Sequence, residues 1–169
     1  MAAKQHHYEV RVTWTGNKGS GTSSYRSYSR AHRIDGAGKV SIEGSSDSSF
    51  QGDPTRWNPE ELLLASLSAC HKLWYLGLCA EAGITVVSYE DDAEGSMLEE
   101  RNGAGQFTSV VLHPHVTLAA GADKARAEAL HTTAHAMCFI ARSVNFPVEY
   151  QPIIQVSSLY AVGPRRDEP

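Results

Sequence analysis

The sequence predicts a mixed α+β fold. Three features indicate it: alternating apolar and polar residues near both ends of the chain, a long run of helix formers that begins at Asn58, and a shorter helical pattern before the last strand. Strands that are followed by helices and then by further strands are typical of α+β domains. A length of 169 residues suits one domain. We expect residues 1–162 to form it and residues 163–169 to be a disordered tail.

The composition excludes several classes of protein. With 41% hydrophobic residues the chain can fold without disulfides, and an odd number of widely spaced cysteines, at positions 70, 79 and 138, favours a reducing cytoplasm. A formal charge of −4 without a basic block argues against a nucleic-acid partner. The apolar runs are much shorter than the about 20 residues of a membrane-spanning helix, and the N-terminus shows no signal peptide. We therefore predict a cytoplasmic protein without a membrane partner.

The N-terminal third is predicted to form short strands. Residues 8–14 alternate between apolar and polar side chains, as a half-buried strand does. The turn formers of residues 15–21 lead into a Ser- and Tyr-rich segment, residues 22–34, which we expect to be the second strand of a hairpin. A short third strand is expected at residues 39–42, and a long loop at residues 44–57.

A long helix is predicted to begin at Asn58. Asn58 is a suitable N-cap, Pro59 occupies the first helical position and Glu61 the third. Good helix formers continue to Ala82, and Gly83 is a plausible stop. About 24 residues at 1.5 Å rise give a helix of about 36 Å.

The C-terminal half alternates between strands and helices. The predicted elements are strands at residues 84–89, 107–118 and 148–156, and helical segments at residues 124–136 and 138–144. Asp123 is the expected cap of the first of these helices. Pro114 and Pro152 interrupt the last two strands, which indicates edges or bulges.

Helical spacing places one apolar stripe along the long helix. Its members are Leu63, Ser66, Leu67, Cys70, Leu73, Trp74, Gly77 and Leu78. Cys79 lies half a turn away from Cys70 and about 13.5 Å along the axis, so these two cannot form a disulfide, which needs α-carbons within about 7 Å. A disulfide can therefore join Cys138 to either Cys70 or Cys79. Taken alone, Cys79 is expected to be a small buried hydrophobe.

The segment N-P-E-E-L-L-L-A-S-L-S-A-C, residues 58–70, resembles the first signature of the OsmC/Ohr family, the organic hydroperoxide resistance proteins. Family members carry N-P-E-[EQ]-L, small residues and a cysteine ten positions after the first Glu, here Glu60 and Cys70. A second family cysteine opens a short helix before the last strand, and A-M-C-F-I-A-R-S-V with Cys138 matches that placement. The resemblance covers about residues 7–157 and implies an OsmC/Ohr-like fold: antiparallel sheets, a long central helix carrying the first cysteine, and an intertwined homodimer.

The resemblance implies a thiol-dependent peroxidase that reduces organic hydroperoxides without a cofactor or a metal. Cys70 would attack the O–O bond and become a sulfenic acid, and Cys138 would condense with it to a disulfide. An external thiol or dithiol would then reduce that disulfide. Because an apolar stripe favours the thiol over the thiolate, a nearby cation is required.

In the family an arginine supplies this cation and the Glu of the N-P-E motif, here Glu60, holds it. The two positions at which family members place the arginine are Lys18 and Phe50 in this sequence. Of the substitutes Arg26, Arg30, Arg33 and Arg56, we select Arg30, since alternation places Arg26, Tyr28 and Arg30 on one face of the predicted second strand. Glu60 lies about 15 Å of helical rise from Cys70, so either the first turn bends away or two chains share the site.

Two alternatives use the same residues differently. A non-catalytic dimer of this fold could bind a small apolar or thiol-reactive ligand, or sense oxidants. A metal site could use Cys70 and Cys138 with His131 and His135, which are spaced to lie on one helix face. His71 points about 100° away from Cys70 around the helix and is expected to be structural.

Overall fold

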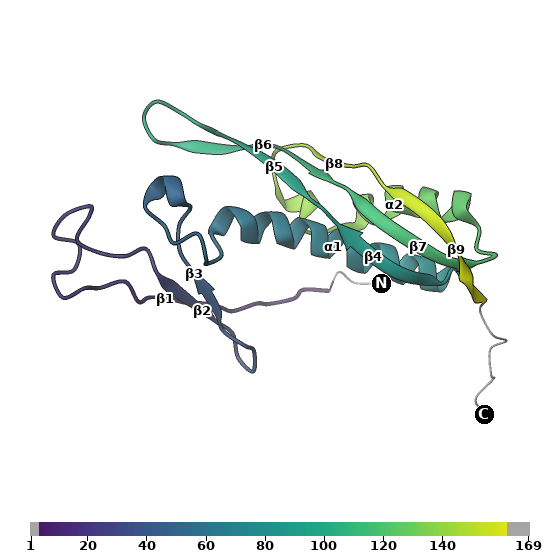
Figure 1. The fold of residues 1–169 in the computed structure, drawn as a ribbon, viewed down its shortest axis with the longest axis horizontal. Helices are drawn as coiled ribbons and strands as arrows, with labels where there is room; N and C mark the ends of the chain where they lie inside the picture. Colours follow the sequence, from purple (N-terminus) through teal and green to yellow (C-terminus); the bar gives the residue numbers. More distant parts are fainter. Residues whose placement is uncertain (1–3, 162–169) are drawn as a thin grey trace. The chain divides into compact units, whose positions relative to one another are not determined.

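The computed structural model describes residues 4–161. They fall into two compact units, one that extends to Leu63 and one that begins at Leu64. The elements of both are labelled in Figure 1. The single domain of residues 1–162 stays a prediction, and the expected tail at residues 163–169 lies outside the described residues.

The N-terminal unit holds a small antiparallel sheet. Its strands are β1 (Arg11–Trp14), β2 (His32–Asp35) and β3 (Ile42–Gly44), in the order β1-β2-β3, and a 3-10 turn follows at Ser48–Phe50. The predicted strand at residues 22–34 is wrong, because β2 contains only the end of that segment. The Asn17 side chain accepts hydrogen bonds from two glycine amides of the turn, and Ser27 bonds to nearby carbonyls. Such local side-chain bonds compete with strand pairing.

Helix α1 (Pro59–Glu81) begins and ends where the sequence predicts. The Glu61 amide donates to Asn58 Oδ1 at 2.7 Å, and the Asn58 amide donates to Glu61 Oε2 at 3.2 Å. This reciprocal capping box satisfies two of the amides that a helix start leaves free. Gly83 follows the helix with φ 72°, a left-handed conformation that glycine adopts at little cost.

The buried face of α1 differs from the predicted apolar stripe. The buried residues are Leu67, His71, Tyr75 and Cys79, one on each successive turn. Leu73, a member of the predicted stripe, is 67% exposed. The sequence predicted only that the stripe residues share a face, and the core buries a polar residue, His71, which has a buried partner.

The C-terminal unit contains two three-stranded sheets and a second helix among its described residues. The strands are β4 (Val86–Asp91), β5 (Glu94–Glu99), β6 (Gly105–Leu112), β7 (Pro114–Ala120), β8 (Val148–Tyr150) and β9 (Ile153–Ala161), in the orders β4-β7-β9 and β5-β6-β8. Helix α2 (Lys124–Met137) precedes β8, with a 3-10 turn at Ala141–Ser143 between them. Asp123 caps α2 by accepting from the Arg126 amide, as predicted.

The last two strands pair in parallel, β8 with β6 and β9 with β7. The prediction of purely antiparallel sheets is therefore wrong in part. Parallel pairing needs a long crossover, and α2 provides it between β7 and β9. Two predicted strands are also divided: Pro114 begins β7 after a break at His113, and Gln151 and Pro152 separate β8 from β9.

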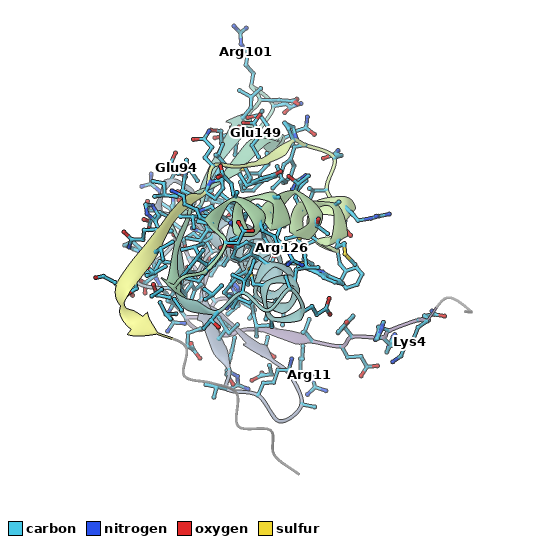
Figure 2. All side chains as sticks on the ribbon, turned by 90° about the vertical axis from the view of Figure 1, so that its right-hand side faces the viewer. Lys4, Arg11, Glu94, Arg101, Arg126 and Glu149 are labelled. Atoms are coloured by element: carbon cyan, nitrogen blue, oxygen red, sulfur yellow. The ribbon has the colours of Figure 1, made fainter. Side chains whose placement is uncertain are left out.

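Both helices contribute to one hydrophobic core. Tyr75 and Cys79 of α1 pack with Leu118 of β7, Ala134 of α2 and Ile154 of β9. Figure 1 shows α2 and the C-terminal part of α1 on the same side of these strands. In Figure 2 the labelled Arg101, in the turn between β5 and β6, extends away from the C-terminal unit.

Among the described residues, α1 is the one helix whose length and apolar composition would suffice to cross a membrane, with 23 residues and a mean hydropathy of 1.3. A core helix of a soluble protein meets the same criterion. Because Tyr75 and Cys79 are fully buried against the sheet and α2, the fold is compatible with a soluble protein.

A buried pair of histidines joins α1 to α2. His71 Nε2 and His131 Nδ1 share a hydrogen bond of 2.9 Å, and the two side chains are 1% and 0% exposed. The Tyr75 ring stacks on His131 at a centroid distance of 3.8 Å. Burial lowers the pKa of His71 to about 4 and that of His131 to about 3, with smaller contributions from the charges of His135 and His71 respectively. Both rings are therefore neutral at pH 7.

Because both histidines are neutral in the folded protein, we expect the protein to lose stability in mild acid. An unfolded histidine has a pKa of about 6.5, so between about pH 6.5 and pH 4 the unfolded chain binds protons that the folded chain does not. Two such groups make the free energy of unfolding fall by up to about 2.7 kcal/mol per pH unit as the pH drops. Urea unfolding at pH 7 and at pH 5 measures this loss. The double variant His71→Phe/His131→Phe should lose much less over the same interval, and an equal loss in both proteins would contradict the assignment.

Candidate functional site

The structure brings the thiols of Cys70 and Cys138 together. Cys70 lies near the middle of α1, and Cys138 is the C-cap of α2. The Cys70 thiol is close enough to influence the pKa of Cys138, both are free thiols, and Cys70 lines one cleft with Phe139, the residue after Cys138. Of the two pairings left open by the sequence, the geometry therefore favours Cys70 with Cys138.

The third cysteine, Cys79, has another environment. Its side chain is fully buried in the core beside Tyr75. Burial raises the pKa of the Cys79 thiol above its ordinary value, and the nearby Tyr75 opposes this shift only in part. A buried, protonated thiol is a small hydrophobe, as predicted.

The surroundings of Cys138 keep it protonated. Burial raises the pKa of Cys138 to about 11, and the neighbouring Cys70 thiol adds to the rise. The Ala141 amide donates to the Cys138 sulfur at 3.4 Å and opposes the shift. Cys138 is 1% exposed, whereas Cys70 is only partly buried. The pair is thus asymmetric: one thiol is accessible, and the other is enclosed and protonated at neutral pH.

Cys70 opens onto an apolar cleft of about 490 Å³. The cleft is lined by Ser66, Ala69, Cys70, Leu73, Trp74, Phe139 and Ile140. The rings of Trp74 and Phe139 meet edge to face at 5.7 Å and form one wall. This volume falls within the range of small-molecule sites.

Phe139 is a site residue that sequence reasoning did not identify. It is 67% exposed although it is aromatic, and it directly follows Cys138. An aromatic residue next to the second cysteine was the available signal. Trp74 was predicted to share the face of Cys70, and both line the cleft.

Arg30 and Glu60 belong to the N-terminal unit, and neither forms an ion pair within residues 4–161. The Arg30 guanidinium lies 4.2 Å from the ring centroids of Tyr25 and Tyr28, and Nη1 donates to the Tyr28 carbonyl at 2.9 Å. Its Nη2 is buried without a hydrogen-bond partner. The prediction that Arg26, Tyr28 and Arg30 share one face of a strand was wrong, because residues 22–31 form no strand.

The helix between Glu60 and Cys70 runs without a break. The first explanation offered by the sequence, a first turn that bends away, is therefore wrong. Ten residues of α1 correspond to about 15 Å of rise. Two of the alternative arginines are paired elsewhere: Arg33 with Asp35, and Arg56 with Glu43 and Asp53.

The histidines do not form a metal site with the cysteines. Within residues 4–161, no group of three His, Cys, Asp or Glu side chains is arranged to hold a metal ion. His131 Nδ1 instead forms a hydrogen bond with His71 Nε2. The ring centroids of His135 and Tyr150 lie 5.3 Å apart.

Comparison with known proteins supports the resemblance. Residues 52–151 match the family described as OsmC-like protein. An OsmC-like protein of unknown function from Vibrio cholerae is 33% identical, with 88% of this chain and all of that chain covered and a TM-score of 0.78. The uncharacterized protein YmaD of Bacillus subtilis is 25% identical over 150 residues, 86% of this chain and 91% of that protein.

A more distant structure shows the same fold. The organic hydroperoxide resistance protein OhrB of Bacillus subtilis is 19% identical, with 88% of this chain and 98% of that chain covered and a TM-score of 0.58. Since the family match spans more than half of the sequence and the fold agrees, this chain belongs to the OsmC-like protein family.

Proposed function

We propose that this protein is a thiol-dependent peroxidase that reduces organic hydroperoxides through Cys70 and Cys138. Membership in the OsmC-like family indicates a redox or peroxide-stress role. The observation that carries the finer proposal is the pair of neighbouring free thiols, Cys70 and Cys138, of which Cys70 lines the apolar cleft and Cys138 does not. The fold neighbours named as organic hydroperoxide resistance proteins support the same chemistry.

In the first step the Cys70 thiolate attacks the terminal oxygen of the hydroperoxide. The new S–O bond forms as the O–O bond breaks, which leaves a sulfenic acid on Cys70 and an alkoxide that takes up a proton to become an alcohol. The sulfur is oxidised and the peroxide is reduced by two electrons. The aromatic wall of the cleft suits an apolar organic group on the peroxide.

In the second step Cys138 resolves the sulfenic acid. Its sulfur attacks that of Cys70, an S–S bond forms, and the hydroxyl leaves as water with the Cys138 proton. An external thiol or dithiol then reduces the disulfide by exchange and is itself oxidised to a disulfide. A reducing cytoplasm, our proposed location, would supply such a reductant.

Activation of Cys70 would need a cation, and Arg30 is our candidate. The buried Nη2 of its guanidinium makes no hydrogen bond among the described residues, and it could donate to a carboxylate such as that of Glu60. Since Glu60 lies too far along its own helix to reach Cys70, we propose that a homodimer combines these residues from two chains.

Substitution of each cysteine should give a different result. Cys70→Ser should lower cumene hydroperoxide consumption with dithiothreitol to the rate seen without protein, because the nucleophile is gone. Cys138→Ser should still react once and leave a sulfenic acid that dimedone traps. Cys79→Ser is the matched control and should keep the parent rate. Equal slow rates in the parent and Cys70→Ser would refute the peroxidase and favour a ligand-binding or oxidant-sensing dimer.

Substitution of Arg30 tests the proposed cation. Because a hydrogen bond to a charged group is worth about 1.5–3 kcal/mol, Arg30→Ala should slow the oxidation of Cys70 by about tenfold or more. Arg26→Ala, a change of the same charge in the same segment, is the control and should leave the rate within about twofold. Stopped-flow measurement of the first oxidation reports both. Equal rates in the two variants would remove Arg30 from the mechanism.

A further inference from the structure

We infer that His71 and His131 are a positioning pair that holds the Cys138 thiol against the Cys70 thiol. The effect of this pair on turnover rests on the proposed peroxidase function. The positioning itself can be measured on the two thiols alone. The pair lies outside the cleft and contributes nothing to its lining.

The two histidines are placed next to the two cysteines by the helices that carry all four. His71 directly follows Cys70 on α1. On α2, His131 and His135 precede the C-cap Cys138 by seven and three residues, a spacing that places all three on one helix face. The same two helices therefore meet at a thiol contact and at a histidine contact.

The contact between the two histidines is a single hydrogen bond. In two neutral imidazoles one nitrogen donates and one accepts, so the 2.9 Å bond uses one donor and one acceptor. The remaining nitrogens, His71 Nδ1 and His131 Nε2, are buried and have no hydrogen-bond partner among the described residues. Each of the two rings therefore makes this one hydrogen bond among the described residues, and loss of the bond leaves the other ring without a partner.

Aromatic stacking limits the directions in which the rings can move. His71 and His131 are nearly parallel, at an interplanar angle of 8°, with Tyr75 stacked on His131. Tyr150 of β8 lies 5.5 Å from His71 and donates a hydrogen bond to Thr132 of α2 at 3.0 Å. We infer that the stack and the histidine bond together resist sliding of α2 along α1.

The position of α2 determines whether the disulfide can form. A disulfide needs α-carbons within about 7 Å and correctly directed β-carbons, and Cys138 is at the very end of α2. A small shift of α2 along α1 would separate the sulfurs without unfolding either helix. A Cys70 sulfenic acid would then persist and become open to further oxidation.

The inference can be tested without peroxide by measuring the effective concentration of the Cys70 and Cys138 thiols at equilibrium with glutathione. In this equilibrium the two protein thiols are oxidised to a disulfide while oxidised glutathione is reduced to two glutathione thiols, and mass spectrometry of peptides identifies the bond. His71→Phe and His131→Phe, which keep a flat ring, should lower the effective concentration by about tenfold or more. His71→Gln and His131→Asn keep a donor and an acceptor at a similar reach and should stay within about threefold of the parent.

Two further variants separate positioning from stability. The double variant His71→Phe/His131→Phe leaves no unpaired imidazole, so its urea midpoint should return toward that of the parent while its effective concentration stays low. Tyr150→Phe keeps the ring beside His71 but removes the exposed hydrogen bond to Thr132 of α2, and it should leave the effective concentration unchanged.

The outcomes distinguish the two proposals. A parent-like effective concentration in folded His71→Phe, or its recovery in the double variant together with the urea midpoint, overturns the positioning role. Suppose that the disulfide forms with glutathione in the parent and not in His71→Phe, and that the parent consumes no hydroperoxide. The positioning role then holds and the peroxidase proposal fails. In an active parent, His71→Phe should form the sulfenic acid at the parent rate and the disulfide more slowly.

Discussion

The contact between α1 and α2 is the constraint on which the site depends. Cys70 is fixed by a helix whose start is capped by Asn58 and Glu61, and Cys138 is fixed by the end of a helix capped by Asp123. Neither helix alone makes a redox pair, because each contributes one thiol. The core cluster and the histidine bond that hold the helices together are therefore as much a part of the site as the sulfurs.

The two thiols differ because their helices expose them differently. Cys138 is enclosed and accepts amide hydrogen bonds from the turn that follows it, while burial raises its pKa to about 11. A thiol in that state attacks peroxide poorly, since the thiolate is the nucleophile. It is nevertheless well placed to attack a sulfenic sulfur that appears beside it. In the mechanism that we propose, the accessibility of Cys70 and the enclosure of Cys138 divide the two chemical steps between them.

Much of this arrangement could be predicted from the sequence, and the failures have physical causes. The capping residues and the helix lengths follow from local chemistry, so α1 and α2 were predicted closely. The strand at residues 22–34 failed because serine and asparagine side chains satisfy the backbone locally. The His71–His131 bond could not be predicted, since residues 60 positions apart meet only in the folded chain. The role of Arg30 also depends on long-range placement, and alternation was a poor guide to it.

The rotation of α1 relative to the predicted stripe connects the fold to its chemistry. Hydrophobicity alone would bury Leu73 and Trp74, yet both line the open cleft and Leu73 is 67% exposed. The core instead buries His71, whose desolvation is offset by His131 and by the stack of Tyr75 and Tyr150. Had the apolar stripe been buried, Cys70 would have been buried with it and no hydroperoxide could reach the sulfur. A polar pair in the core and an apolar face toward the cleft are thus two consequences of one helix orientation.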